Sequence, residues 1–281
     1  MIINNQKIVV FDMDETLGYF VEFAMFWEML KKYAKNQNMD VEKIFTQEYF
    51  NKVLDLFSEF IRPNILNILK FIRQKKISKN CHSVMIYTNN QGPKEWSYLI
   101  TNYFHYKLNY KLFDRVICAF KVNGKQIEFC RTTHDKTIKD FARCSKLPDN
   151  VEICYLDDSY YPDMNAENVY YIKIKPYTYD LPFKQMIHRY INNPISNIIL
   201  EKRHDDDESI SQFIDFMEEN MNKYEFVNIE KRKNETDIDK IVTKKILMHL
   251  HIFFKRGNNS SNNKSLKKYI KRGQLKTRRH R

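Results

Sequence analysis

The sequence predicts an α/β fold in which helices cover both faces of a parallel sheet. Short apolar runs rich in β-branched and aromatic residues alternate with longer segments whose apolar residues recur at three- and four-residue spacing. The short runs lack polar alternation, as expected of strands that are covered on both faces. The 281 residues are 43% hydrophobic and 14% aromatic, which provides a buried core and excludes wholesale disorder.

Five short runs are predicted to be the strands of this sheet. The first, Lys7–Phe11, is apolar and stops abruptly at Asp12. Because helical segments separate the runs along the chain, we expect the strands to be parallel. The other four are Ser83–Thr88, Arg115–Phe120, Glu152–Leu156 and Val169–Ile174.

Helices are predicted between the strands and after the last of them. Residues 20–60 repeat apolar side chains at helical spacing, and Pro63 is expected in the first turn of the next helix. Further helices are predicted at Asn64–Lys75, Lys94–Tyr106, Asp135–Cys144, Asp205–Glu225 and Asp237–Phe254. We therefore divide the chain into a main domain (1–195) with a helical insert (18–61), a helical extension (196–256) and a flexible tail (257–281).

The net charge of +12 is concentrated at the C-terminus. Residues 255–281 hold 11 of the 47 basic residues and no acid, so residues 1–254 hold 36 basic and 35 acidic residues. Gly257–Lys264 resembles a flexible linker. The basic tail is interpreted either as a nuclear-targeting or nucleic-acid-binding arm or as a solvated segment without a partner.

Several classes of protein are excluded by composition. The five glycines do not cluster, so a Walker loop and a GxGxxG fingerprint are absent. Five cysteines without a CxxC pair argue against a disulfide framework and favour a reducing, intracellular compartment. The N-terminus lacks the pattern of a signal peptide, and no apolar run is long enough to span a membrane.

Acidic and polar residues follow three of the predicted strands. Asp12 and Asp14 follow the first strand, and Asp157–Asp158 follow the fourth. The second strand ends in Thr88 and is followed by Asn89 and Asn90. Ligands of open parallel sheets bind at the carboxyl ends of strands, and clustered carboxylates attract Mg²⁺. A metal beside a carboxylate nucleophile suits phosphoryl transfer.

These residues give the chain a specific resemblance. FDMDETL (Phe11–Leu17), MIYT ending at Thr88, and YLDDS (Tyr155–Ser159) resemble motifs one, two and four of the haloacid dehalogenase superfamily. Within it, the chain is most similar to the NLI-interacting-factor-like group, which includes phosphatases of the RNA polymerase II carboxy-terminal domain. Arg62–Pro63 before the following helix, and TIKDF at Thr137–Phe141 after Cys130–Arg131, resemble further elements of that group. The resemblance covers about residues 5–178.

The resemblance implies a Rossmann-like sheet of order 3-2-1-4-5 and a Mg²⁺-dependent phosphatase. Asp12 would be the nucleophile that forms an aspartyl phosphate, and Asp14 the general acid and base. Thr88 would hydrogen-bond the phosphoryl group, with Asn89 beside it, and Lys139 would offset the charge of the transition state. The metal would be held by Asp12, by the carbonyl of Asp14, and by Asp158 or Asp157.

Some alternatives remain open at this point. Lys136 is a rival to Lys139 at helical spacing, and Asp163 is a rival third acid, although a surface turn is expected there. Phe23, Phe26, Trp27 and Phe57 form either a cap that grips the substrate or ordinary helix packing, with packing preferred. Met217 and Met221 are expected to pack within the protein, and His249 and His251 are interpreted as structural.

The substrate is also open. The group usually carries a short β-hairpin after motif one, whereas Gly18–Ile61 is predicted to be a small helical cap here. A phosphoserine or phosphothreonine protein is the preferred substrate class. Thr88–Gly92 resembles the loop of polynucleotide 3′-phosphatases and histidinol-phosphatases, so nucleic-acid ends or small metabolites come second. A non-catalytic scaffold that binds through its basic tail is the remaining alternative.

Overall fold

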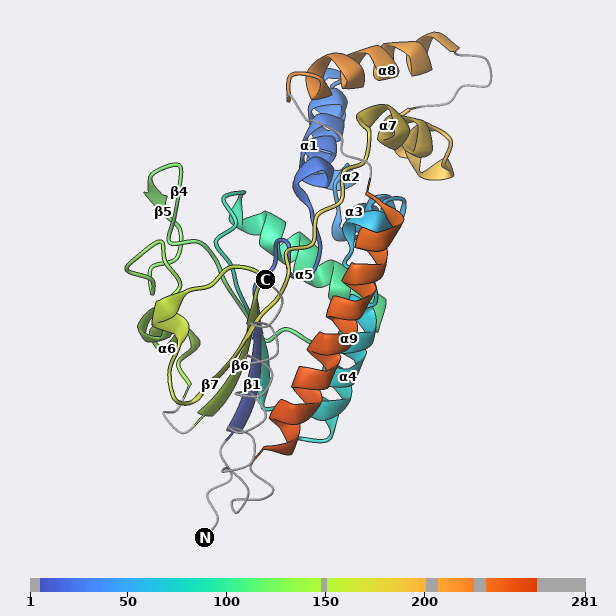
Figure 1. Ribbon diagram of the computed structural model, residues 1–281. Coiled ribbons are helices and arrows are strands. Elements are labelled where there is room, and N and C mark those ends of the chain that lie inside the picture. The colour runs from blue at the N-terminus through green and yellow to red at the C-terminus, as the bar shows by residue number, and fades with distance from the viewer. Residues whose placement is uncertain (1–5, 148–150, 201–206, 225–230, 257–281) are drawn as a thin grey trace, which may run out of the picture.

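The protein is built on a five-stranded parallel sheet (Figure 1). The computed structural model describes all residues except 1–5, 148–150, 201–206, 225–230 and 257–281. The spatial order is β3-β2-β1-β6-β7, and every neighbouring pair is parallel. The strands are β1 (Gln6–Phe11), β2 (Ser83–Tyr87), β3 (Arg115–Ile117), β6 (Val151–Asp157) and β7 (Val169–Lys173).

This architecture confirms the predicted α/β class and the predicted order of the five strands. A small antiparallel hairpin, β4 (Lys121–Val122) with β5 (Lys125–Gln126), lies in the chain between the third and fourth strands of the sheet. The predicted third strand was too long, because β3 ends at Ile117 and the chain leaves the sheet before the hairpin.

Alternate residues of the central strand β1 contribute to two separate cores. Ile8 and Val10 pack in a cluster with Phe141 of α6 (Ile138–Ser145), whereas Val9 and Phe11 belong to the larger cluster on the other face. Successive side chains of a strand point to opposite faces, and a sheet covered on both faces needs apolar residues at every position. This explains why β1 reads as a continuous apolar run.

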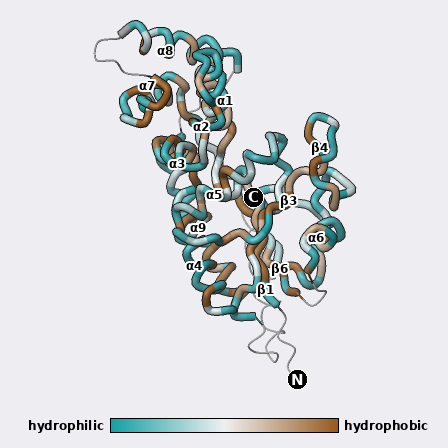
Figure 2. Tube along the Cα trace, turned by 180° about the vertical axis from the view of Figure 1, so that it is seen from behind, coloured by the Kyte–Doolittle hydropathy of each residue, from teal (hydrophilic) through white to brown (hydrophobic). Residues whose placement is uncertain are grey.

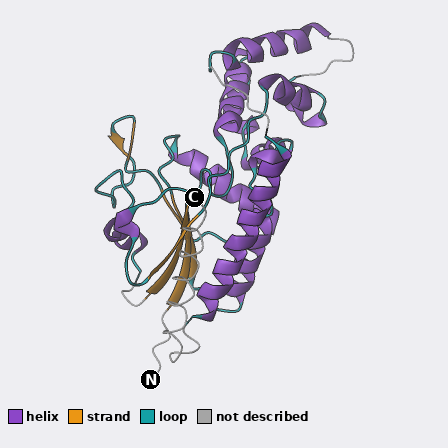
Figure 3. Ribbon diagram, in the orientation of Figure 1, coloured by secondary structure: helices purple, strands orange, loops and turns teal. Residues whose placement is uncertain are grey.

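Helices cover both faces of the sheet unequally (Figures 1 and 3). The larger layer contains α4 (Ile65–Ile77), α5 (Lys94–Leu108) and α9 (Lys233–Lys255). Helix α4 contacts α5 and α9, and α9 also contacts β7. Helix α4 starts after Asn64, which has a φ of 61°, so Pro63 precedes the helix instead of lying in its first turn.

The helical insert forms the core of a second group of helices above the sheet in Figure 1. It contains α1 (Val21–Asn36), α2 (Val41–Ile44), α3 (Gln47–Asp55) and the short 3₁₀ helix Ser58–Phe60. The prediction of helices in this segment is confirmed. Helices α7 (Phe183–Ile191) and α8 (Asp207–Met221) and the 3₁₀ helix Pro194–Ile198 complete the group, in which α8 contacts both α1 and α7.

Aromatic side chains fill this upper group of helices and belong to the larger core cluster. Hydrophilic and hydrophobic residues alternate along these helices, as expected when one face of each helix is buried (Figure 2). Phe26 and Phe57 meet edge to face at 5.3 Å, and Tyr33 of α1 meets Phe213 of α8 at 4.9 Å between ring centres. Phe23, Phe26, Trp27 and Phe57 are each fully buried, which agrees with the packing interpretation.

The predicted helical extension therefore divides between two layers. Helix α8 adds to the upper group, where Met217 and Met221 are buried, and α9 adds to the layer over the sheet. His249 and His251 of α9 are structural as predicted, since His249 bonds the Tyr170 hydroxyl at 2.7 Å and His251 packs on Phe71. None of the described helices combines the length and hydropathy needed to cross a membrane.

Candidate active site

The predicted site residues converge at the carboxyl edge of the sheet. Asp12 directly follows β1 and Asp157 ends β6, while the amide of Asp12 donates to Leu156 O at 2.8 Å. The amide of Thr88, which follows β2, donates to Ile117 O at 3.0 Å. The predicted site residues at this edge border a pocket of about 180 Å³. It is lined by Asp12, Asp14, Glu15, Thr88, Asn89, Asn90, Lys136, Asp157, Asp158, Ser159 and Tyr161.

A tight turn after β1 presents Asp12 and Asp14 to this pocket. Within it, the amide of Glu15 donates to Gly18 O at 2.7 Å, and Glu15 has a φ of 54°. A Cβ atom at Gly18 would lie only 2.4 Å from Phe60 O, so a larger residue would displace the backbone. Gly18 thus allows the chain to enter the insert directly after the turn.

Lys136, and not Lys139, occupies the site. The Lys136 ammonium donates to Oδ1 of Asp12 at 2.6 Å and to Oδ2 of Asp157 at 2.7 Å, and its side chain is 1% exposed. Lys139 is exposed on α6 and does not line the pocket. The prediction of Lys139 was wrong because the helix begins at Ile138, after an N-cap at Thr137, and not at Asp135. Lys136 therefore lies in the preceding loop, which enters the site.

Three carboxylates beside Lys136 could hold a metal ion. Asp12, Asp157 and Asp158 each offer an oxygen atom, and these atoms lie within 4.8 Å of one another. Oxygen-only ligands of this kind fit a hard divalent cation such as Mg²⁺. Asp157 and Asp158 both belong to the cluster, so both remain candidate ligands. Asp163 is exposed in the 3₁₀ helix Pro162–Met164 and does not line the pocket, as expected of a surface turn.

Asp14 has a different environment from the three clustered carboxylates. Its Oδ2 accepts a hydrogen bond from the Asn90 side chain at 2.9 Å. Asn90 is itself fixed, because its Oδ1 accepts from the amide of Gly92 at 2.8 Å and its own amide donates to the Thr88 hydroxyl. Burial raises the pKa of Asp14 above its ordinary value, although the bond from Asn90 opposes this. A carboxyl group with a raised pKa suits the role of a general acid.

The pKa values of Asp12 and Lys136, at the centre of the site, depend on each other. Burial raises the pKa of Asp12 well above its usual value, while the neighbouring Lys136 opposes the rise. For Lys136 burial alone would lower the pKa, but Asp12 and Asp157 outweigh it and hold the pKa above its ordinary range. The lysine is therefore a permanent positive charge between two carboxylates.

The segment that carries Lys136 is anchored by a buried arginine and a disulfide. Arg131 is 1% exposed and donates to the carbonyls of Thr88 at 3.1 Å, Cys118 at 2.9 Å and His134 at 2.9 Å. It thereby joins the Thr88 loop to the Lys136 loop. Cys130 and Cys144 form a disulfide across the same segment. Although the sequence argued against a disulfide framework, this single bond forms because folding brings two distant cysteines together.

Several residues of the site were not predicted from the sequence. Asn89, which was predicted, lines the pocket and donates to the Tyr161 hydroxyl at 3.2 Å. Asn90 was expected at this edge of the sheet but was given no role, and Tyr161 was not proposed as a site residue. The Tyr161 ring lies 5.2 Å from the Lys136 ammonium. The position of Asn90 two residues after Thr88 was visible in the sequence, whereas nothing in it linked Tyr161 to Lys136.

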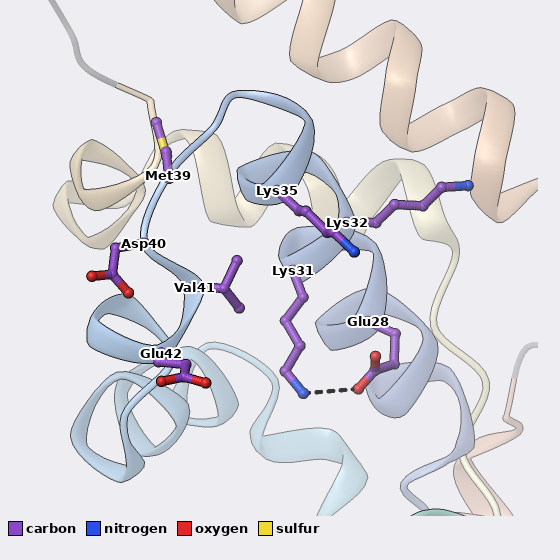
Figure 4. A pocket seen from close by; sticks show the side chains of 8 residues that line it. All are labelled: Glu28, Lys31, Lys32, Lys35, Met39, Asp40, Val41 and Glu42. Carbon is purple, nitrogen blue, oxygen red and sulfur yellow. Dashed lines mark hydrogen bonds and ion pairs between the residues drawn. The ribbon is translucent and has the colours of Figure 1, made fainter.

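A second, larger cavity of about 620 Å³ lies in the helical insert (Figure 4). It is lined by Glu28, Lys31, Lys32, Lys35, Met39, Asp40, Val41 and Glu42. Lys31 is already paired with Glu28 at 3.0 Å, and Lys32 donates to Asn220 at 2.8 Å. Since its charges are mixed and two of the lysines have partners, this cavity does not resemble a site for an anionic ligand.

Comparison with known proteins identifies no relative: no family model, no curated protein and no solved structure matches the chain. We therefore infer the function from the geometry of the site and from the motifs in the sequence.

Proposed function

We propose that this protein is a Mg²⁺-dependent phosphatase that forms an aspartyl phosphate on Asp12. The observation that carries the proposal is the ion-paired group at the carboxyl edge of the sheet. There Lys136 lies between Asp12 and Asp157, with Asp158 alongside and Asp14 held apart by Asn90. A scaffold that only binds a partner has no need for this buried arrangement, since burying charges is costly unless they are paired.

Each residue has a role that follows from its position. The Asp12 carboxylate attacks phosphorus, and the bond between phosphorus and the leaving oxygen breaks while Asp14 donates a proton to that oxygen. Asp14 then accepts a proton from the water molecule that hydrolyses the aspartyl phosphate. Lys136 and the Thr88 hydroxyl are placed to offset the negative charge that develops on the phosphoryl oxygens.

Asp12, Asp157 and Asp158 would hold the Mg²⁺ ion, as their shared oxygen cluster supports. When bound, Mg²⁺ neutralises negative charge that would otherwise repel the phosphate group from the nucleophile. The chain's own residues do the rest: Arg62 and Arg131 hold the two loops that carry Asp14 and Lys136.

For the substrate, a phosphoserine or phosphothreonine residue of a protein is the class we propose. The resemblance to the NLI-interacting-factor-like group, on motifs one, two and four and on Arg62–Pro63, supports this class. The lysine in the site is Lys136, whereas the resemblance indicated Lys139. The Asn90 contact to Asp14 belongs to the loop that resembles polynucleotide 3′-phosphatases, which keeps 3′-phosphorylated nucleic acid as the second class to test.

The decisive experiment compares the native chain with Asp12→Asn. Hydrolysis of an aryl phosphate, a phosphoserine peptide and a 3′-phosphorylated oligonucleotide is measured with Mg²⁺ and with EDTA. We expect activity only with Mg²⁺, inhibition by beryllium fluoride, and loss of turnover in Asp12→Asn, because an amide cannot attack phosphorus.

Asp163→Asn is the matched control, since Asp163 is an exposed acid outside the pocket. It should retain full activity. Turnover by folded Asp12→Asn, or full activity in EDTA, would refute the proposed mechanism. The relative rates on the three substrates identify the substrate class.

A further inference from the structure

The turn after β1 is held by a buried arginine from the end of the helical insert. Arg62 is 1% exposed, and its guanidinium donates to Thr16 O at 2.7 Å, to Glu15 O and to Lys175 O at 2.9 Å. Its amide also donates to Leu17 O at 3.1 Å. Because three of these carbonyls, those of residues 15–17, directly follow Asp14, the position of Arg62 fixes the position of Asp14.

The charge of Arg62 has no carboxylate in contact. Among the described residues no acid lies within ion-pair distance of Arg62, and its Nη1 atom is buried without a hydrogen-bond partner. Burial lowers the pKa of Arg62 to about 10, and the carboxylate that opposes this most is Asp239. A buried guanidinium needs such compensation, since an uncompensated buried charge is strongly destabilising.

Asp239 belongs to α9, far from the site in the sequence, and is 1% exposed. It is ion-paired with Lys231 and, at 3.7 Å, with Lys175. Lys175 is the residue whose carbonyl accepts a bond from Arg62. Asp239 and Arg62 therefore hold the same residue, one through its side chain and the other through its backbone.

Tyr177 strengthens the connection between α9 and the turn. Its ring contacts two cations, with Arg62 at 5.4 Å and Lys231 at 4.2 Å from the ring centre. Its amide donates to Glu15 O at 2.9 Å, beside the bond from Arg62 to the same carbonyl. Separately, the Thr243 hydroxyl of α9 donates to Pro63 O at 2.8 Å. Helix α9 is thus connected to the turn in two ways, through Tyr177 and through Pro63.

We propose that Asp239 is a positioning residue for the active site, which acts through Arg62 and the segment 175–177 to hold the turn that carries Asp14. Helix α9, which lies outside motifs one, two and four, would thereby contribute to the arrangement of the active site. For catalysis the inference rests on the proposed phosphatase function, but the arrangement of the turn can be measured without any activity.

The kinetic test uses leaving groups of different acidity. Asp239→Asn is nearly isosteric and removes only the charge, and Asp237→Asn is the matched control, because Asp237 is an exposed acid on the same helix. A misplaced general acid slows the release of a basic alcohol more than the release of an acidic phenol. We expect Asp239→Asn to reduce kcat for an alkyl phosphate by about tenfold or more, with little effect on p-nitrophenyl phosphate.

A merely structural role for Asp239 predicts a different result. If Asp239→Asn only lowered the folded fraction, both substrates would lose the same factor, and this would overturn the proposal. Arg62→Lys should show the same substrate-dependent loss. Because Asp239 acts through Arg62, the double variant Asp239→Asn with Arg62→Lys should lose no more activity than the more impaired single variant. Additive losses would also contradict the proposal.

Hydrogen exchange provides the readout that does not depend on activity. In Asp239→Asn, the amides of Glu15, Leu17 and Tyr177 should exchange at least several-fold faster, because their bonds hold the turn. The amides of β1 and all amides of Asp237→Asn should remain unchanged. If the native chain proves inactive, the proposed function fails while this measurement still decides the inference. Unchanged exchange at the turn would refute it.

Discussion

Replacing Lys136 by methionine tests the centre of the proposed site most directly. The change keeps the length of the side chain and removes one charge that is 1% exposed and bonded to Asp12 at 2.6 Å and to Asp157 at 2.7 Å. Removing one partner of a buried ion pair costs about 3–5 kcal/mol of stability, because the other charge is left uncompensated. Removing a group that stabilises the transition state costs about 10²–10³ in kcat.

The matched control is Lys139→Met, which lies three residues further along the chain and is exposed. An exposed substitution of this kind changes stability by less than about 0.5 kcal/mol. We therefore expect normal kcat and a normal unfolding midpoint for Lys139→Met, measured with an aryl phosphate and by denaturant unfolding.

Magnesium adds a further expectation for Lys136→Met. Its remaining carboxylates, Asp12 and Asp157, repel one another without the lysine, so Mg²⁺ should raise its stability more than that of the native chain. Kinetics are measured under conditions well below the midpoint of denaturant unfolding, so that a loss of activity reflects catalysis and not unfolding. Loss of activity in Lys139→Met together with normal activity in Lys136→Met would refute the assignment of the lysine.

Three other predictions concern stability and the tail. Burial raises the pKa of Glu22 to about 7, so its folded state favours the proton, and stability is lost as pH rises from 4.5 through about 7. In denaturant unfolding, the free energy of unfolding of Glu22→Gln should therefore exceed that of the native chain by up to about 3 kcal/mol near pH 9 and equal it near pH 4. An equal gain at both pH values would contradict this. Cys130→Ser should lower stability by up to about 3 kcal/mol without reductant and have little effect with it, because the disulfide closes a loop of 14 residues; the same loss under both conditions would exclude the disulfide as its cause. Deleting 258–281 should leave aryl phosphate turnover unchanged and remove most non-specific nucleic-acid binding, since 9 of the 11 terminal basic residues lie there; a severalfold change in turnover would show that the tail reaches the site.

Most of the fold could be predicted because it depends on local patterns. The central parts of β1, β2 and β6 are buried on both faces, so each contains an apolar run that is followed by a polar residue: residues 8–11, 84–87 and 153–156. The helical insert was visible from the spacing of its aromatic residues, most of which are buried. Boundaries were less accurate where a single capping residue decides them, as Thr137 does for α6 and Asn64 for α4.

The sequence alone determined where the carboxylates lie, because Asp12, Asp14 and Asp157 are attached to strand ends. The alternation of strands and helices predicted that the strands are parallel, and the family resemblance implied the order in which they lie. Tertiary structure decided which distant groups meet them. Lys136 enters the site only because α6 starts at Ile138, and Cys130 pairs with Cys144 only because the intervening segment folds back. Asp239 reaches the neighbourhood of Arg62 across 177 positions of sequence for the same reason. Such contacts depend on how helices pack on the sheet, and packing is a property of the whole chain that no local spacing records.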